Sequence, residues 1–126
     1  LDTVEVWMRY MKAHDDNDLK AIREANADDF KAWASDGSVI ENTDAQIALL
    51  TDWFATSNPK WMHKYSIANE FTDQEGKLQQ WVTTGWDLTE TVEGKESKRQ
   101  EIFDVLIADG KIKTIYIAAR PINESE

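Results

Sequence analysis

The sequence has 126 residues, of which 41% are hydrophobic, 10% aromatic and 30% charged. This length and composition are typical of one folded domain, so we expect residues 1–126 to form a single domain. Its 24 acidic and 14 basic residues give a formal charge of -10, which disfavours binding to nucleic acids and to anionic membranes. The chain contains no Cys, which excludes disulfides and cysteine nucleophiles. It begins at Leu1 rather than Met, which leaves room for a removed signal peptide, so no compartment is assigned.

Two helices are predicted at the start of the chain. Residues 3–14 carry apolar side chains at helical spacing, at Val4, Trp7, Met8 and Met11. An acidic run follows, and Asp18 is a suitable N-cap for a short second helix that turns Leu19 and Ile22 inward. His14 stands beside the acidic run and is expected to be solvated.

A short strand pair and a third helix come next. The first strand is predicted around residues 30–34, and the turn pair Asp36-Gly37 leads to Val39 and Ile40. Thr43 and Gln46 have the spacing of a capping box, which predicts the start of a third helix. Pro59 predicts that this helix ends before it.

From residue 61 onward the hydrophobic period changes from helical to two, which predicts strands. Trp61, His63, Tyr65, Ile67 and Phe71 fall on one face of the first of them. Gly-Lys pairs at residues 76–77, 94–95 and 110–111 predict three hairpin turns, because glycine readily adopts positive φ. The joined strands, at about 61–71, 78–90, 97–108 and 111–119, would form an antiparallel meander. The chain is therefore predicted to be α+β, with its N-terminal helices packed on a strongly curved antiparallel sheet.

This order of elements resembles the nuclear transport factor 2-like superfamily, particularly its SnoaL-like and ketosteroid-isomerase-like members. Three stretches carry the resemblance: Arg9-Tyr10 leading to Asp18-Leu19 and Ala27-Asp28-Asp29, Trp81 with Gly85, and Ile102 to Val105 leading to Asp109-Gly110-Lys111-Ile112. The resemblance implies a cone-shaped fold with a pocket at its open end, and a homodimer formed through the outer face of the sheet. Such folds host isomerases, cyclases, dehydratases, hydrolases and binding proteins, so the fold alone does not give the function.

The resemblance also implies roles for particular residues. Tyr10 matches a tyrosine that donates a hydrogen bond to an enolate oxygen; the alternative is a tyrosine packed on the sheet with its hydroxyl at the rim. Glu101 matches a carboxylic acid held protonated by apolar surroundings; the alternative is a carboxylate neutralised by Arg99 or by a cross-strand group. The position of the family's proton-shuttling base corresponds to Ala34, which cannot move a proton. This departure counts against ketosteroid-type isomerisation.

Two other side chains are candidates for the missing base. His63 shares the inward face of its predicted strand with Trp61, where it could act as a general acid or base, or be a hydrogen-bonded core residue. Asp36 could reach the pocket from its loop, although Asp before Gly is common turn chemistry. Neither histidine has a partner at the spacing of a metal site, so no metal and no cofactor are expected.

The aromatic residues predict what the pocket would bind. Trp33, Trp53, Trp61, Trp81 and Phe103 are candidate ligand-binding residues for a flat apolar molecule; the alternative is a large aromatic core. Trp81 and Trp86 should lie on opposite faces of their strand, because an odd number of positions separates them. The sequence thus favours a small-molecule-binding domain with Tyr10, His63, Glu101 and Asp36 as catalytic candidates, and it leaves open whether the domain is an enzyme. The alternative is a non-catalytic module that associates through its sheet.

Overall fold

The computed structural model describes residues 2–122; residue 1 and residues 123–126, at the two ends of the expected domain, lie outside the described residues. Three helices and six strands form the described part of the chain. In chain order they are α1 (Thr3–Asp15), α2 (Leu19–Ala25), β1 (Asn26–Trp33), β2 (Val39–Ile40), α3 (Thr43–Ser57), β3 (Lys60–Thr72), β4 (Leu78–Val92), β5 (Lys95–Ala108) and β6 (Lys111–Pro121).

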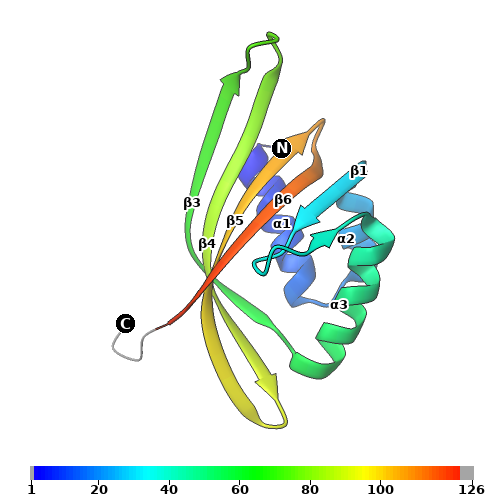
Figure 1. Ribbon diagram of the computed structural model, residues 1–126, viewed down its shortest axis with the longest axis vertical. Helices are drawn as coiled ribbons and strands as arrows, with labels where there is room; N and C mark the ends of the chain where they lie inside the picture. The colour runs from blue at the N-terminus through cyan, green and yellow to red at the C-terminus, as the bar shows by residue number, and fades with distance from the viewer. Residues whose placement is uncertain (1, 123–126) are drawn as a thin grey trace.

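The strands form one curved sheet with the order β2-β1-β6-β5-β4-β3. The four C-terminal strands pair as the predicted antiparallel meander, whereas β1 runs parallel to β6. The sheet is therefore mixed at one edge. The helices lie together on one side of it, and the long β3–β4 hairpin extends past them (Figure 1). This arrangement confirms the predicted α+β fold, with helices packed on a strongly curved sheet.

Polar side chains begin all three helices. Asp2 accepts a hydrogen bond from the Glu5 backbone N–H, and Asp18 caps α2 as predicted. Helix α3 begins differently from the expected capping box, because Asn42 rather than Thr43 is its N-cap. Gln46 therefore does not cap the helix, and its side chain is buried. An N-cap that accepts the first free N–H groups stabilises a helix by about 1 kcal/mol.

Glycines make the three predicted hairpin turns. Gly76, Gly94 and Gly110 have φ values of 80°, 80° and 74°, in a region that residues with a side chain rarely adopt. Each turn falls between two strands of the meander. The predicted hairpins are thus confirmed, and they fix the register of strands β3 to β6.

One irregularity in β3 changes which side chains face the helices. His63 pairs with Trp86, but Tyr65 pairs with Gly85, so the register shifts by one residue at Lys64. Such a bulge reverses the inward and outward alternation beyond it. Tyr65 consequently lies against Gly85 on the outer face, and a Cβ at residue 85 would come within 2.2 Å of its ring.

Candidate functional site

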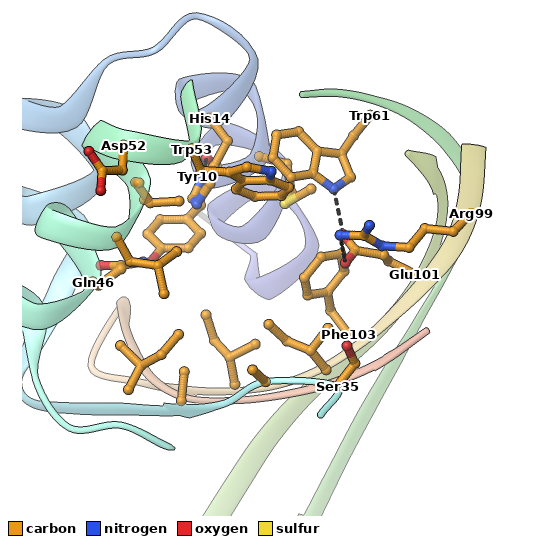
Figure 2. Close-up of a pocket in the computed structure, with 18 of the residues that line it drawn as sticks. Tyr10, His14, Ser35, Gln46, Asp52, Trp53, Trp61, Arg99, Glu101 and Phe103 are labelled. Carbon is orange, nitrogen blue, oxygen red and sulfur yellow. Dashed lines mark hydrogen bonds and ion pairs between the residues drawn. The ribbon is translucent and has the colours of Figure 1, made fainter. Parts of the chain in front are cut away.

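A cavity of about 490 Å³ lies between α1, α3 and the concave face of the sheet (Figure 2). This volume falls in the range of small-molecule sites, roughly 300–1,000 Å³. Most of its lining side chains are apolar or aromatic: Trp7, Met11, Ala32, Ala34, Ile40, Leu49, Leu50, Trp53, Trp61, Phe103, Ile115 and Ile117. The polar lining residues are Tyr10, His14, Ser35, Gln46, Asp52, Thr56, Arg99 and Glu101. The cavity therefore suits a largely apolar molecule that carries few polar groups.

Aromatic rings form one wall of the cavity. The ring of Trp61 lies edge-on to Trp53 at 5.4 Å and edge-on to His14 at 5.7 Å between ring centroids. His14 is also edge-on to Tyr10, at 4.8 Å. Edge-to-face contacts of this kind stabilise aromatic packing. The wall is thus built from α1, α3 and β3, of which α1 is distant in sequence from the other two.

Glu101 and Arg99 stand together on one side of the cavity. The Trp61 Nε1–H donates to Glu101 Oε1 at 2.8 Å, and the Arg99 guanidinium lies 3.5 Å from Glu101 Oε2 (Figure 2). Arg99 also bonds Glu90, which accepts a hydrogen bond from Trp53 Nε1 at 2.7 Å. We call Glu90, Arg99 and Glu101 the Arg99 cluster. Two indole N–H groups and one guanidinium thereby hold two carboxylates beside an apolar cavity.

Burial controls the protonation of Glu101. The residue is only 5% exposed, and this desolvation raises the pKa of its carboxyl, while the Trp61 hydrogen bond and the charge of Arg99 act in the opposite direction. Desolvation is the largest of these effects. Glu101 therefore binds a proton at higher pH than a solvated glutamate does, and in its protonated form it can donate a hydrogen bond to a ligand.

The Tyr10 hydroxyl is engaged within the protein. It donates to Asn26 Oδ1 at 2.8 Å and accepts from Gln46 Nε2 at 2.5 Å. Asn26 in turn donates to Gln46 Oε1 and to Thr43 Oγ1. Burial raises the pKa of Tyr10, so the phenol keeps its single proton. Since Asn26 Oδ1 accepts the hydrogen bond that this proton makes, Tyr10 cannot donate to a ligand unless this network rearranges.

His14 lies in the cavity wall, which corrects the expectation that it is solvated. It is 8% exposed, and its Nδ1 is 2.7 Å from the Tyr10 carbonyl oxygen. Burial lowers the pKa of His14 from 6.5 to about 4, so the imidazole is neutral near neutral pH. The spacing of Trp7, Tyr10, Met11 and His14 along α1 is itself helical, and this signal could have indicated the burial.

The structure brings five of the sequence-predicted site residues into the cavity wall: Tyr10, Trp53, Trp61, Glu101 and Phe103. Figure 2 shows Tyr10 with Gln46 on one side, and Glu101, Arg99 and Phe103 on the other. Asn26, Gln46 and Glu90 have no sequence signal that assigns them to the site, because only tertiary packing brings them to Tyr10 and Arg99. Arg99 was predicted as the neutralising partner of Glu101, and their ion pair agrees with that alternative.

The two candidate bases lie outside the lining of the cavity. His63 is exposed beside Trp86, and its Nε2 is 2.6 Å from Ser66 Oγ. Asp36 is exposed in its turn, where hydrogen bonds from the Ser38 hydroxyl and backbone N–H lower the pKa of its carboxyl. Asp36 therefore has the geometry of a turn residue, and neither group lies where it could act on a ligand in the cavity.

Two expected ligand-binding tryptophans also lie elsewhere. Trp33 stacks on Tyr116 with 4.9 Å between ring centroids. Trp81 also stacks on Tyr116, with 6.1 Å between ring centroids. Ala32 and Ala34 line the cavity, so the intervening Trp33 points to the outer face. Trp86 is buried on the inner face, as its odd spacing from Trp81 predicts. The placement of Trp33 and Trp81 thus corrects their expected place in the pocket.

The position that the resemblance assigns to a proton-shuttling base is a methyl group in the wall. Ala34 lines the cavity next to Ser35.

Across residues 2–122, no cluster of three or more His, Cys, Asp or Glu side chains is placed to hold a metal ion. In the same part of the chain, the helices lack the length and apolarity needed to cross a membrane.

Solved structures share this architecture at low sequence identity. The sequence itself matches no protein-family model and no curated protein. A protein from Jannaschia sp. CCS1, assigned as a SnoaL-like polyketide cyclase, has a TM-score of 0.70 and 16% identity, over 92% of this chain and 83% of that chain. An LEH-like epoxide hydrolase of M. tuberculosis has a TM-score of 0.77 and 14% identity, over 92% and 80% of the two chains.

A third similar structure contains a bound small molecule. It is a protein from Catenulispora acidiphila DSM 44928 with a ketosteroid isomerase-like fold, in complex with trimethylamine. Its TM-score is 0.70 and its identity 10%, over 93% of this chain and 85% of that chain. The chain therefore has the nuclear transport factor 2-like fold. The resemblance inferred from the sequence is confirmed at the level of the fold.

Proposed function

We propose that the protein binds a small, flat and largely apolar organic molecule in the cavity between its helices and its sheet. The observation that carries this proposal is the 490 Å³ cavity, whose wall is aromatic and apolar except for a few polar groups. Burial of apolar surface would supply most of the binding free energy, at about 25 cal/mol per Å². Proteins of this fold with bound small molecules, such as the trimethylamine complex, are consistent with the proposal.

The polar end of the ligand would meet Glu101 and Arg99. These groups lie beside each other in the cavity wall, and both can donate a hydrogen bond when Glu101 is protonated. A carbonyl oxygen is an acceptor that such donors would recognise. The catalytic form of this proposal is cofactor-free acid–base chemistry on a carbonyl compound, namely isomerisation, cyclisation or dehydration. In that form Glu101 would donate a hydrogen bond to the oxygen on which charge develops.

Titration with 2-acetylnaphthalene and naphthalene tests this proposal. We expect both to bind with quenching of tryptophan fluorescence, because Trp53 and Trp61 are in the cavity wall. Glu101→Leu, which removes the hydrogen-bond donor, should weaken binding of the ketone at acidic pH about tenfold relative to naphthalene. Glu96→Leu, an exposed change on the same strand, is the matched control. Absence of binding, or equal effects of the two substitutions, would contradict the proposal.

The outer face of the sheet supports a second proposal, that the chain forms a homodimer. Trp33, Tyr116 and Trp81 stack in a row there, and Tyr116 is 45% exposed. Apolar surface of this kind is typical of protein interfaces. An interface that covers the row is compatible with ligand binding, because the cavity opens on the other side of the sheet.

Sedimentation equilibrium tests the dimer. We expect Tyr116→Glu to shift the protein toward monomer at least tenfold in dissociation constant, since it would bury a charge in the interface. Val92→Glu is the control, because Val92 is 47% exposed near a hairpin turn rather than in the aromatic row. A monomeric native protein, or identical behaviour of the two variants, would refute this surface as the interface.

A further inference from the structure

The ring of His14 has a defined tautomer. Its Nδ1 lies 2.7 Å from the backbone oxygen of Tyr10, and a carbonyl oxygen can only accept a hydrogen bond. The proton of the neutral imidazole is therefore on Nδ1, and Nε2 carries a lone pair. Because the rings of Tyr10, Phe54 and Trp61 pack edge-on around the imidazole, its orientation is fixed.

The Nε2 atom of His14 is an acceptor without a hydrogen-bond partner among residues 2–122. No described residue donates a hydrogen bond to it, and within residues 2–122 no fully buried side-chain nitrogen or oxygen is left unpaired. Nε2 is therefore accessible, and the residue that carries it is 8% exposed and lines the cavity. An accessible acceptor on a side chain that is otherwise packed among aromatic rings points to a hydrogen-bonded ligand.

The other polar groups near His14 are already engaged. Tyr10 and Gln46 are bonded to each other and to Asn26. Glu101 and Arg99 stand on the other side of the cavity from Tyr10 and His14 (Figure 2). His14 is thus a buried acceptor available to a ligand at the α1 end of the cavity, whereas Asp52, another acceptor in the lining, is exposed on α3.

We propose that Nε2 of His14 accepts a hydrogen bond from a hydroxyl or N–H group on the bound molecule, so that the cavity selects aromatic alcohols and similar donors. This inference rests on the proposed ligand-binding function and adds a specificity-determining residue to it. Neutrality of the imidazole near pH 7 agrees with the acceptor role. A ligand in this position would have its donor at α1 and its second polar group, where it has one, at the Arg99 cluster.

Calorimetric titration with 2-naphthol and 2-methoxynaphthalene tests the inference, because the methyl ether lacks only the donor. The native protein should bind 2-naphthol about tenfold more tightly, the value of one good hydrogen bond. His14→Phe keeps an aromatic ring and should abolish this preference, while the acceptor in His14→Gln should restore part of it. Glu101→Gln should change both affinities by a similar factor and leave the preference in place.

The outcomes separate the inference from the proposed function. Binding of both compounds without a preference, or a preference that depends on Glu101 rather than His14, would overturn the role of His14 and leave the cavity as a ligand site. Binding of neither compound would overturn both. Nitrogen-15 NMR gives an independent check in the native protein. The Nδ1–H tautomer is expected, with an Nε2 signal that moves on addition of 2-naphthol but not of its ether, and an Nε2–H tautomer would refute the inference.

Discussion

Thr84→Val should lower the free energy of unfolding by about 2–6 kcal/mol, although valine has nearly the same shape as threonine. Thr84 is 0% exposed, and its Oγ1 accepts hydrogen bonds from the indole N–H groups of Trp7 at 2.8 Å and Trp86 at 2.7 Å. One oxygen thus pairs two donors from different elements, α1 and β4. A methyl group in its place would leave both indole N–H groups buried and unpaired, at a cost of about 1–3 kcal/mol each.

Thr83→Val is the matched control for this prediction. Thr83 neighbours Thr84 on β4, but it faces outward and donates to Asp104 in an exposed position. We expect that change to cost less than about 1 kcal/mol, because water can replace the lost partner. Urea denaturation of the two variants measures the difference. Similar stabilities would mean that the Trp7 and Trp86 N–H groups do not depend on Thr84.

Acidification should destabilise the protein through His14. Burial lowers the pKa of this group from 6.5 to about 4, so between these values the unfolded chain binds a proton that the folded chain does not. The contribution of neutral His14 to stability is therefore fully present above about pH 6.5 and is lost as the pH falls toward 4. The total loss is about 3 kcal/mol, since each pKa unit corresponds to about 1.4 kcal/mol.

Comparison with His14→Phe isolates this effect from other titrations. Glu101 acts with the opposite sign: its pKa is raised in the folded protein, so its contribution favours folding at low pH and is lost as the pH rises. This contribution is present in both proteins. Between about pH 7 and about pH 4.5, the native protein should lose roughly 2–3 kcal/mol more than His14→Phe in urea denaturation. Parallel pH profiles would show that His14 is not buried as a neutral group.

The sequence was informative where local chemistry decides the structure. Glycines at residues 76, 94 and 110 predicted the hairpins, because few other residues adopt their backbone angles. Asp18 predicted the start of α2. Alternation along β5 also predicted that Glu101 and Arg99 share a face, and their ion pair follows from it. Each of these features is determined by residues that are close in the sequence or joined by one turn.

The sequence was less informative where one residue changes the register. The assumption of a regular strand placed His63 and Tyr65 on one face, whereas the bulge at Lys64 turns Tyr65 outward. His63 keeps its inward register but lies on an edge strand, away from the cavity lining. The α1 stripe also continues to His14, whereas the adjacent acidic run favours a solvated position for it. The hydrogen bonds of Tyr10 with Asn26 and Gln46 could not be predicted, since they join α1, β1 and α3.

The parallel pairing of β1 with β6 has a consequence for biosynthesis. Trp33 on β1 lies opposite Tyr116 on β6, near the other end of the chain. A chain that emerges from the ribosome has already exposed its first strand long before the last one is made, and such distant pairings form late in folding. The floor of the cavity, to which both strands contribute, can therefore close only after β6 has been translated. Nascent chains that end before β6 should lack a closed cavity.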